Sequence, residues 1–169
     1  MKEILKRTLV RMLICCVIAL LFCITGNAKV PYIPKIINYS VSDYKAGNQN
    51  WAVSQGPGGK MYIGNNRGLL VFDGIHWDLV KLPNNLGVRA LYISKDGRIY
   101  VGSFEEFGYF EMDDENDLIY HSLSSSEMNV YLNNDEFWTI NEYKGEIYFQ
   151  SFRSFFIYDG EKVRTVSYT

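Results

Sequence analysis

The sequence predicts an all-β protein: about three four-stranded antiparallel blades of an incomplete β-propeller, preceded by a helical signal segment. The first observation behind this prediction is a glycine–tyrosine strand motif that occurs at residues 59–64, 97–102 and 145–150. Its copies recur about every 40–50 residues, which is the spacing of propeller blades. The second observation is an aromatic content of 15%, because aromatic side chains favour strands over helices and over disorder.

The N-terminal segment, residues 1–28, has the pattern of a secretory signal peptide. A basic start is followed by an uncharged apolar run at residues 12–24 and then by small residues up to Ala28. The run is shorter than the roughly 20 residues of a membrane-spanning helix, and an uncleaved N-terminal anchor is the alternative. The chain's cysteines all lie in this segment, so the remainder is expected to contain neither a disulfide nor a thiolate metal ligand; they are Cys15, Cys16 and Cys23.

Residues 29–49 are expected to form an N-terminal strand and lead-in to the first repeat. Within them, residues 34–42 (PKIINYSVS) predict one more strand. In a closed ring we expect this strand to become the outermost strand of the last blade.

Each repeat predicts four short strands with turns between them. In the first repeat the strands are expected at about residues 50–55, 60–65, 69–73 and 76–81. The turns contain Asp-Gly and Gly-Gly, which supply the positive φ that tight hairpins require. The repeat tyrosines and the tryptophans are expected to fill space between neighbouring blades. The blades themselves are expected at about residues 50–84, 88–123 and 135–169.

About three blades are fewer than the four to eight with which propellers close. An open array leaves unpaired strand edges, which invite aggregation. The sequence therefore predicts that the chain is a fragment of a longer protein.

Several segments resemble two-component-regulator propeller repeats, in particular the N-terminal periplasmic sensor region of large Gram-negative membrane regulators. The Gly102–Phe110 segment (GSFEEFGYF) is the most specific of them; the others are Asn48–Trp51, Gly64–Leu69 and Phe72–Gly74. The resemblance implies a periplasmic location and a parent protein anchored in the inner membrane. It also implies partners within that parent: the rest of the propeller, a triple-tyrosine domain, and a histidine kinase or LuxR-type output domain. Gln150 departs from the glycine of the pattern and predicts a less regular hairpin there.

The loops between the second and third strands supply the candidate ligand-binding residues. In propellers these loops share one face with the blade-connecting loops, where ligands usually bind. Aromatic rings with amide and guanidinium donors suit a saccharide or another small polar ligand, and the paired carboxylates of the second repeat lie in the same kind of loop. The candidates are Asn65, Asn66, Arg67, Phe104, Glu105, Glu106, Phe152 and Arg153.

Composition and motifs argue against several other functions. Residues 29–169 carry a larger excess of acidic residues than the whole chain, whose net charge is −2, so direct nucleic-acid binding by this segment is not expected. The acidic run at residues 113–117 lacks the EF-hand pattern, and His76 and His121 have no cysteine partners, so no metal site and no cofactor is predicted. We expect a non-catalytic sensor or ligand-recognition segment of a signal-transducing transcriptional regulator. The alternatives are a propeller scaffold for protein–protein interaction and a fragment of a polysaccharide-active propeller enzyme.

Overall fold

The computed structural model describes residues 1–24 and 33–167, which divide into two units, Met1–Ile37 and Asn38–Thr169. The first unit contains helix α1 (Lys2–Ile24), which confirms the helix expected in the signal segment. The expected cleavage motif before Ala28 lies outside the described residues. In the described part of the chain, no helix combines the length and the apolar character needed to cross a membrane.

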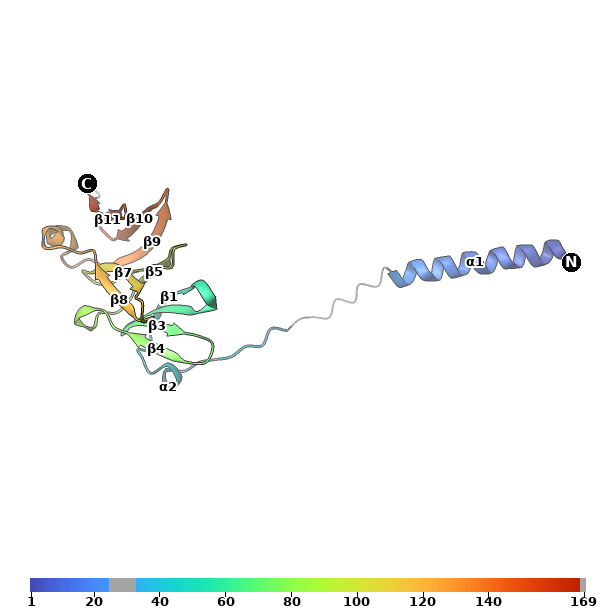
Figure 1. The fold of residues 1–169 in the computed structure, drawn as a ribbon, viewed down its shortest axis with the longest axis horizontal. Helices are drawn as coiled ribbons and strands as arrows, with labels where there is room; N and C mark the ends of the chain where they lie inside the picture. The colour runs from blue at the N-terminus through green and yellow to red at the C-terminus, as the bar shows by residue number, and fades with distance from the viewer. Residues whose placement is uncertain (25–32, 168–169) are drawn as a thin grey trace. The chain divides into compact units, whose positions relative to one another are not determined.

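The second unit contains three four-stranded antiparallel sheets, each made of strands that are consecutive in the chain (Figure 1). Blade 1 contains β1 (Asn50–Gln55), β2 (Met61–Asn65), β3 (Gly68–Phe72) and β4 (Trp77–Val80). Blade 2 contains β5 (Ala90–Ile93), β6 (Ile99–Gly102), β7 (Phe107–Met112) and β8 (Leu118–Ser122). Blade 3 contains β9 (Phe137–Tyr143), β10 (Glu146–Ser151), β11 (Ser154–Tyr158) and β12 (Val163–Ser167). The predicted all-β class with about three antiparallel blades is confirmed.

The first hairpin differs in length between blades. In blade 3, Lys144 and Gly145 connect β9 to β10 with φ angles of 52° and 82°, the left-handed values that a two-residue hairpin needs. In blade 1 the connection is longer, and the backbone N–H of Gly56 donates to the carbonyl oxygen of Lys60 at 2.9 Å. More residues therefore separate the inner strand from the second strand in blade 1 than in blade 3.

The first strand of each blade is the inner strand, because β5 contacts both β1 and β9. Two cores hold the blades together. The core between blades 1 and 2 includes Tyr62, Leu69, Val101 and Phe110. The core between blades 2 and 3 is dominated by aromatic rings, namely Tyr100, Phe107, Phe137, Phe149, Phe156 and Tyr158.

The repeat tyrosines pack between blades as predicted wherever a following blade is described. Tyr62 and Tyr100 are each 4% exposed and join the core that their blade shares with the next. Tyr148 holds the same position in blade 3 and is only half-buried; its hydroxyl donates to Glu146 at 2.9 Å.

The strand expected at residues 34–42 is not formed. Residues 33–40 have no strand pairing, and helix α2 (Val41–Tyr44) follows them. Ser40 starts this helical turn, since its backbone N–H donates to the carboxylate of Asp43 at 2.6 Å. At the end of this helical turn and just after it, Tyr44 and Ala46 are buried against Ile63 and Leu70 of blade 1.

The remaining helical turns lie in connections and were not predicted from the sequence. They are η1 (Pro57–Gly59), η2 (Pro83–Asn85), η3 (Ser126–Met128) and α3 (Asn129–Leu132). The last two form the connection between blades 2 and 3, where Leu132 is buried in the core that these blades share.

Candidate functional site

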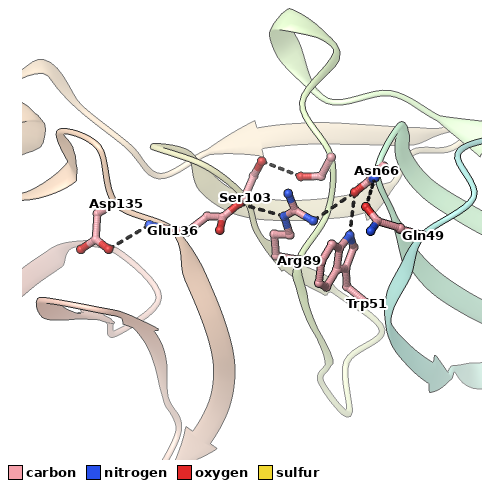
Figure 2. A network of polar contacts seen from close by, with 8 residues as sticks. Gln49, Trp51, Asn66, Arg89, Ser103, Asp135 and Glu136 are labelled. Carbon is pink, nitrogen blue, oxygen red and sulfur yellow. Dashed lines mark hydrogen bonds and ion pairs between the residues drawn. The ribbon is translucent and has the colours of Figure 1, made fainter.

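The inner strands begin at one end of the array, and the loops between second and third strands lie at the same end. We call this region the axial mouth and define it by Gln49, Trp51, Asn66, Arg89, Glu136 and Trp138. It brings together residues from all three blades (Figure 2).

In blade 1 and in blade 3, a bulge in the inner strand directs one tryptophan side chain into the mouth. In blade 1, Asn50 pairs with Asn65 and Ala52 pairs with Gly64, which leaves Trp51 unpaired between them. In blade 3, Phe137 pairs with Ser151 and Thr139 with Gln150, which leaves Trp138 unpaired in the same way. A bulge redirects a side chain out of the regular alternation of a strand.

Arg89 occupies the equivalent position in blade 2. It directly precedes Ala90, which pairs with Gly102. In the same way, Trp51 directly precedes Ala52, which pairs with Gly64. The three blades therefore place tryptophan, arginine and tryptophan at one structural position.

Arg89 connects the polar side chains of the mouth into one network (Figure 2). Its Nε donates to Glu136 Oε1 at 2.9 Å and its Nη1 donates to Asn66 Oδ1 at 3.0 Å. Its guanidinium lies 4.0 Å from the centre of the Trp51 ring, a cation–π contact worth about 0.5–2 kcal/mol depending on its desolvation. The indole N–H of Trp51 donates to Asn66 Oδ1 at 2.7 Å, and the amide of Asn66 donates to Gln49 Oε1 at 2.6 Å.

An aromatic row continues from this network across the mouth. The rings of Trp51 and Trp138 meet edge to face with centroids 6.0 Å apart, and those of Trp138 and Phe152 do so at 5.3 Å. These side chains remain 40%, 39% and 68% exposed. Such exposed rings are unusual unless a ligand or another surface covers them.

Two buried polar side chains hold the loops of the mouth in place. Asn65 is fully buried; its Oδ1 accepts from the backbone N–H groups of Gly47 and Arg67, and its amide donates to the Gly47 carbonyl. Asp135 is 2% exposed and its carboxylate accepts from the backbone N–H groups of Phe152 and Arg153. Asn65 therefore supports the loop and is not accessible to a ligand.

The paired carboxylates of blade 2 turn in different directions. Glu105 has a φ of 53° and accepts from the backbone N–H of Asn134, which ties the loop to the connection before blade 3. Glu106 accepts from the hydroxyls of Tyr120, Ser122 and Ser124 at 2.7–2.8 Å. The hydroxyl network of Glu106 fastens outer strand β8 to the loop, so this carboxylate has a structural role.

Alkaline pH is expected to weaken this anchor. Burial, together with the neighbouring Glu106 carboxylate, raises the pKa of Tyr120. Its contribution to stability is therefore complete below about pH 10, the unfolded tyrosine pKa, and is lost as the pH rises above it, by about 1.4 kcal/mol per unit. Urea titrations of the full chain at increasing pH are expected to show a shallower alkaline loss for Tyr120→Phe than for the wild type. Equal slopes would contradict this role.

The remaining predicted site residues lie at or beside the mouth. Asn66 is part of the network, and Phe152 ends the aromatic row. Phe104 is 40% exposed and its backbone bridges to Glu136. Arg67 and Arg153 are exposed, and the guanidinium of Arg153 reaches the carbonyl oxygen of Asn133 at 3.5 Å.

The sequence did not identify Gln49, Trp51, Arg89, Glu136 and Trp138 as site residues. Trp51 and Trp138 were expected to be packing residues, which is wrong, because the bulge exposes them. Trp51 lies eleven residues before its repeat tyrosine, Tyr62, but the shorter first hairpin of blade 3 puts the equivalent residue, Trp138, only ten residues before Tyr148.

No family model matches the chain, and no curated protein is a significant match. Solved structures do resemble it. The extracellular domain of a one-component system from B. thetaiotaomicron aligns with a TM-score of 0.64 and 12% sequence identity, over 80% of this chain and 19% of that chain. The extracellular domain of a hybrid two-component system from B. thetaiotaomicron gives 0.58 and 18%, over 79% and 17%.

Virginiamycin B lyase from Staphylococcus aureus is also similar, with a TM-score of 0.53 and 16% identity, over 70% of this chain and 41% of that chain. The chain thus spans about a fifth of the length of the two extracellular domains. At these identities the likeness establishes the fold: the chain is an array of propeller blades with the fold found in extracellular domains of bacterial one- and two-component systems.

Proposed function

We propose that the chain is a non-catalytic ligand-recognition segment of a periplasmic sensor propeller, belonging to a signal-transducing transcriptional regulator of a Gram-negative bacterium. The observation that carries this proposal is the placement of Trp51, Arg89 and Trp138 at one position of three successive blades. Exposed aromatic rings beside convergent polar groups are the usual composition of a small-molecule site. The fold likeness to extracellular domains of signalling systems supports the same role.

Export by the N-terminal segment is part of the proposal. Helix α1 carries its basic residues in its first half, with Lys2, Lys6, Arg7 and Arg11 before the apolar run, as a signal peptide does. In the parent protein, the blades would pass ligand occupancy to the rest of the propeller and to an inner-membrane output domain.

The ligand is proposed to be a small polar molecule, with saccharides as the leading class. The mouth offers an amide, a guanidinium and a carboxylate that already interact with one another, at side-chain exposures of 24% for Arg89 and 20% for Glu136. Such a preorganised network orients a polar ligand at low entropic cost.

A thermal-shift screen of the full chain with saccharides, amino acids and nucleotides tests this function. We expect at least one compound to raise the Tm of the wild type, and Arg89→Gln to abolish that rise. Arg164→Gln is the matched control, because Arg164 also forms an ion pair, with Glu146 at 2.8 Å, but on outer strand β12. A stabilising compound that acts equally on Arg89→Gln would contradict a site at the mouth.

A lyase activity is the second candidate, and the likeness to virginiamycin B lyase favours it. The carboxylates beside the mouth are engaged in contacts that position loops or Arg89, whereas general acid–base catalysis needs a group within reach of substrate. Incubation of each stabilising compound with the full chain, followed by mass spectrometry, separates the two functions. Recovery of the compound unchanged is expected for a sensor, and turnover would establish the enzyme.

A further inference from the structure

A second cavity lies between blades 1 and 2, at the end of the blades opposite the axial mouth. Each inner strand begins at the mouth, so the hairpin that joins it to the second strand lies at the other end. Two of these hairpins, around Pro57 and Gly97, line the cavity. Its volume is about 480 Å³, within the range of small-molecule pockets. We call it the inter-blade pocket and define it by Pro57, Lys60 and Tyr62 of blade 1 and by Asp96, Glu111 and Met112 of blade 2.

Tyr62 directs an unpartnered hydroxyl at this pocket. The other two repeat tyrosines have partners: Tyr148 donates to Glu146 at 2.9 Å, and Tyr100 accepts from the guanidinium of Arg98. Tyr62 is only 4% exposed and lines the pocket, yet no group among the described residues bonds to its hydroxyl. Buried polar groups normally have a partner, so this hydroxyl is free to bond to a ligand.

Close packing fixes the ring of Tyr62. A Cβ atom on Gly56 would lie 2.6 Å from Cε2 of this ring, so glycine lets the first hairpin of blade 1 approach the ring. The ring also belongs to the core that blades 1 and 2 share. The hydroxyl is therefore held in place before a ligand arrives, which lowers the entropic cost of binding.

Lys60 adds an ammonium beside this hydroxyl. Its backbone is extended, and alternate residues of an extended chain point to the same face. Arg98 and Glu146 hold the same position in blades 2 and 3, where each bonds to its own tyrosine. In the part of the chain that the structure describes, the Lys60 ammonium has no ion-pair partner. Burial raises the pKa of Tyr62, so at neutral pH both groups are donors, which suits a carboxylate.

The blade 2 wall of the pocket carries acceptors. Nη2 of Arg98 lies 3.5 Å from Glu111, and its Nε lies 3.9 Å from Asp96. Both distances are longer than that of a full hydrogen bond. The guanidinium therefore keeps the two carboxylates beside the pocket and leaves them acceptor sites for a ligand ammonium.

The apolar part of the lining lies with these two charged walls. Pro57 and Met112 supply it, and Met112 is 43% exposed, with a flexible thioether that adapts to different shapes. A ligand that pairs with both walls needs opposite charges at its two ends and an apolar body. A free amino acid holds both charges on one carbon atom, and a neutral sugar carries none.

We propose that the inter-blade pocket binds a dipeptide with apolar side chains. Its carboxylate accepts from Lys60 and Tyr62, its ammonium donates to the carboxylates of blade 2, and its side chains contact Pro57 and Met112. This inference goes beyond the proposed function, because the pocket lies at the other end of the blades from the axial mouth and would give the segment a second input.

Calorimetric titrations of the full chain test this site. The probes are leucylleucine, alanylleucine and leucylphenylalanine. We expect at least one of them to bind, and we expect Lys60→Gln and Tyr62→Phe each to weaken that binding about tenfold, as loss of one central contact does. N-acetylation or C-terminal amidation of the bound dipeptide removes one charge, and each change is expected to weaken binding by at least as much. Free leucine is expected to bind more weakly than the dipeptide.

Tyr148→Phe and Lys162→Gln are the matched controls. The first removes the equivalent hydroxyl of blade 3, and the second removes an exposed lysine of blade 3 that is outside the pocket. Both variants are expected to bind the dipeptide like the wild type. Tyr62→Phe retains the buried ring, so its circular dichroism spectrum is expected to match that of the wild type.

Failure of this site and failure of the proposed function give different results. Absence of binding by all three dipeptides would overturn the site, as would binding that Lys60→Gln and Tyr62→Phe leave unchanged or that the two controls weaken equally. Equal binding of the acetylated or amidated dipeptide would also overturn it. Loss of dipeptide binding in Arg89→Gln would assign the ligand to the axial mouth instead. If no compound of the thermal-shift screen acts through Arg89, the proposed function fails and the dipeptide site stands.

Discussion

Replacement of Phe107 by alanine is expected to lower the free energy of unfolding by about 3–5 kcal/mol, the usual cost of removing a buried phenylalanine. Phe107 is fully buried at the centre of the core between blades 2 and 3. Its ring centroid lies 4.8 Å from those of Phe137 and Phe149 and 5.0 Å from that of Phe156. Alanine at this position would therefore leave a large cavity and lose the ring contacts that join blade 2 to blade 3.

Urea unfolding of the full chain, followed by circular dichroism, measures this effect. Phe152→Ala is the control, since Phe152 is 68% exposed and its removal is expected to change stability by at most about 0.5 kcal/mol. Comparable losses for the two variants would show that the aromatic core does not hold the blades together.

Gly102→Ala is expected to destabilise the protein by about 1–3 kcal/mol, because overpacking at a closed interface forces the backbone to shift. The added Cβ would meet the Cβ of Phe137 at 2.5 Å and its Cγ at 3.3 Å. Neither atom lies at the end of a flexible side chain, so blade 3 would have to move away from blade 2.

Gln150→Ala is the control at the equivalent position of blade 3. Because Gln150 lines an open pocket, this substitution is expected to leave the urea midpoint within about 0.5 kcal/mol of the wild type. A neutral Gly102→Ala variant would contradict the close approach of blade 3 to β6.

The sequence predicted the strands of the blades because their determinants are local. Asp73-Gly74 and Lys144-Gly145 adopt positive φ at a glycine in each pair, and such turns fix where neighbouring strands begin and end. The repeat tyrosines predicted that the second strand of each blade packs in the core between neighbouring blades, and the structure buries Tyr62 and Tyr100 there.

The axial mouth could not be predicted in the same way. The exposure of Trp51 and Trp138 depends on a bulge, which is a property of two paired strands and is not visible in one strand's sequence. Likewise, the paired carboxylates Glu105 and Glu106 looked equivalent, yet only the tertiary structure brings Tyr120, Ser122 and Ser124 around Glu106.

The segment before blade 1 shows the same limit. Residues 34–42 predicted a strand, but a strand needs a partner with free edge groups, and in the described structure none pairs with it. The local hydrogen bond between Ser40 and Asp43 instead starts a helical turn, and Tyr44 is buried against blade 1.

Hydrogen exchange measured by mass spectrometry, with and without the compound that raises the Tm most in the thermal-shift screen, tests the central claim that the axial mouth recognises a ligand. We expect slower exchange of the backbone amides around Trp51, Arg89 and Trp138 and in the loop of Phe152, because ordering of the mouth reduces local opening. The outer strands β4 and β8 are expected to exchange at unchanged rates. Protection confined to those outer strands, with none at the mouth, would contradict the claim.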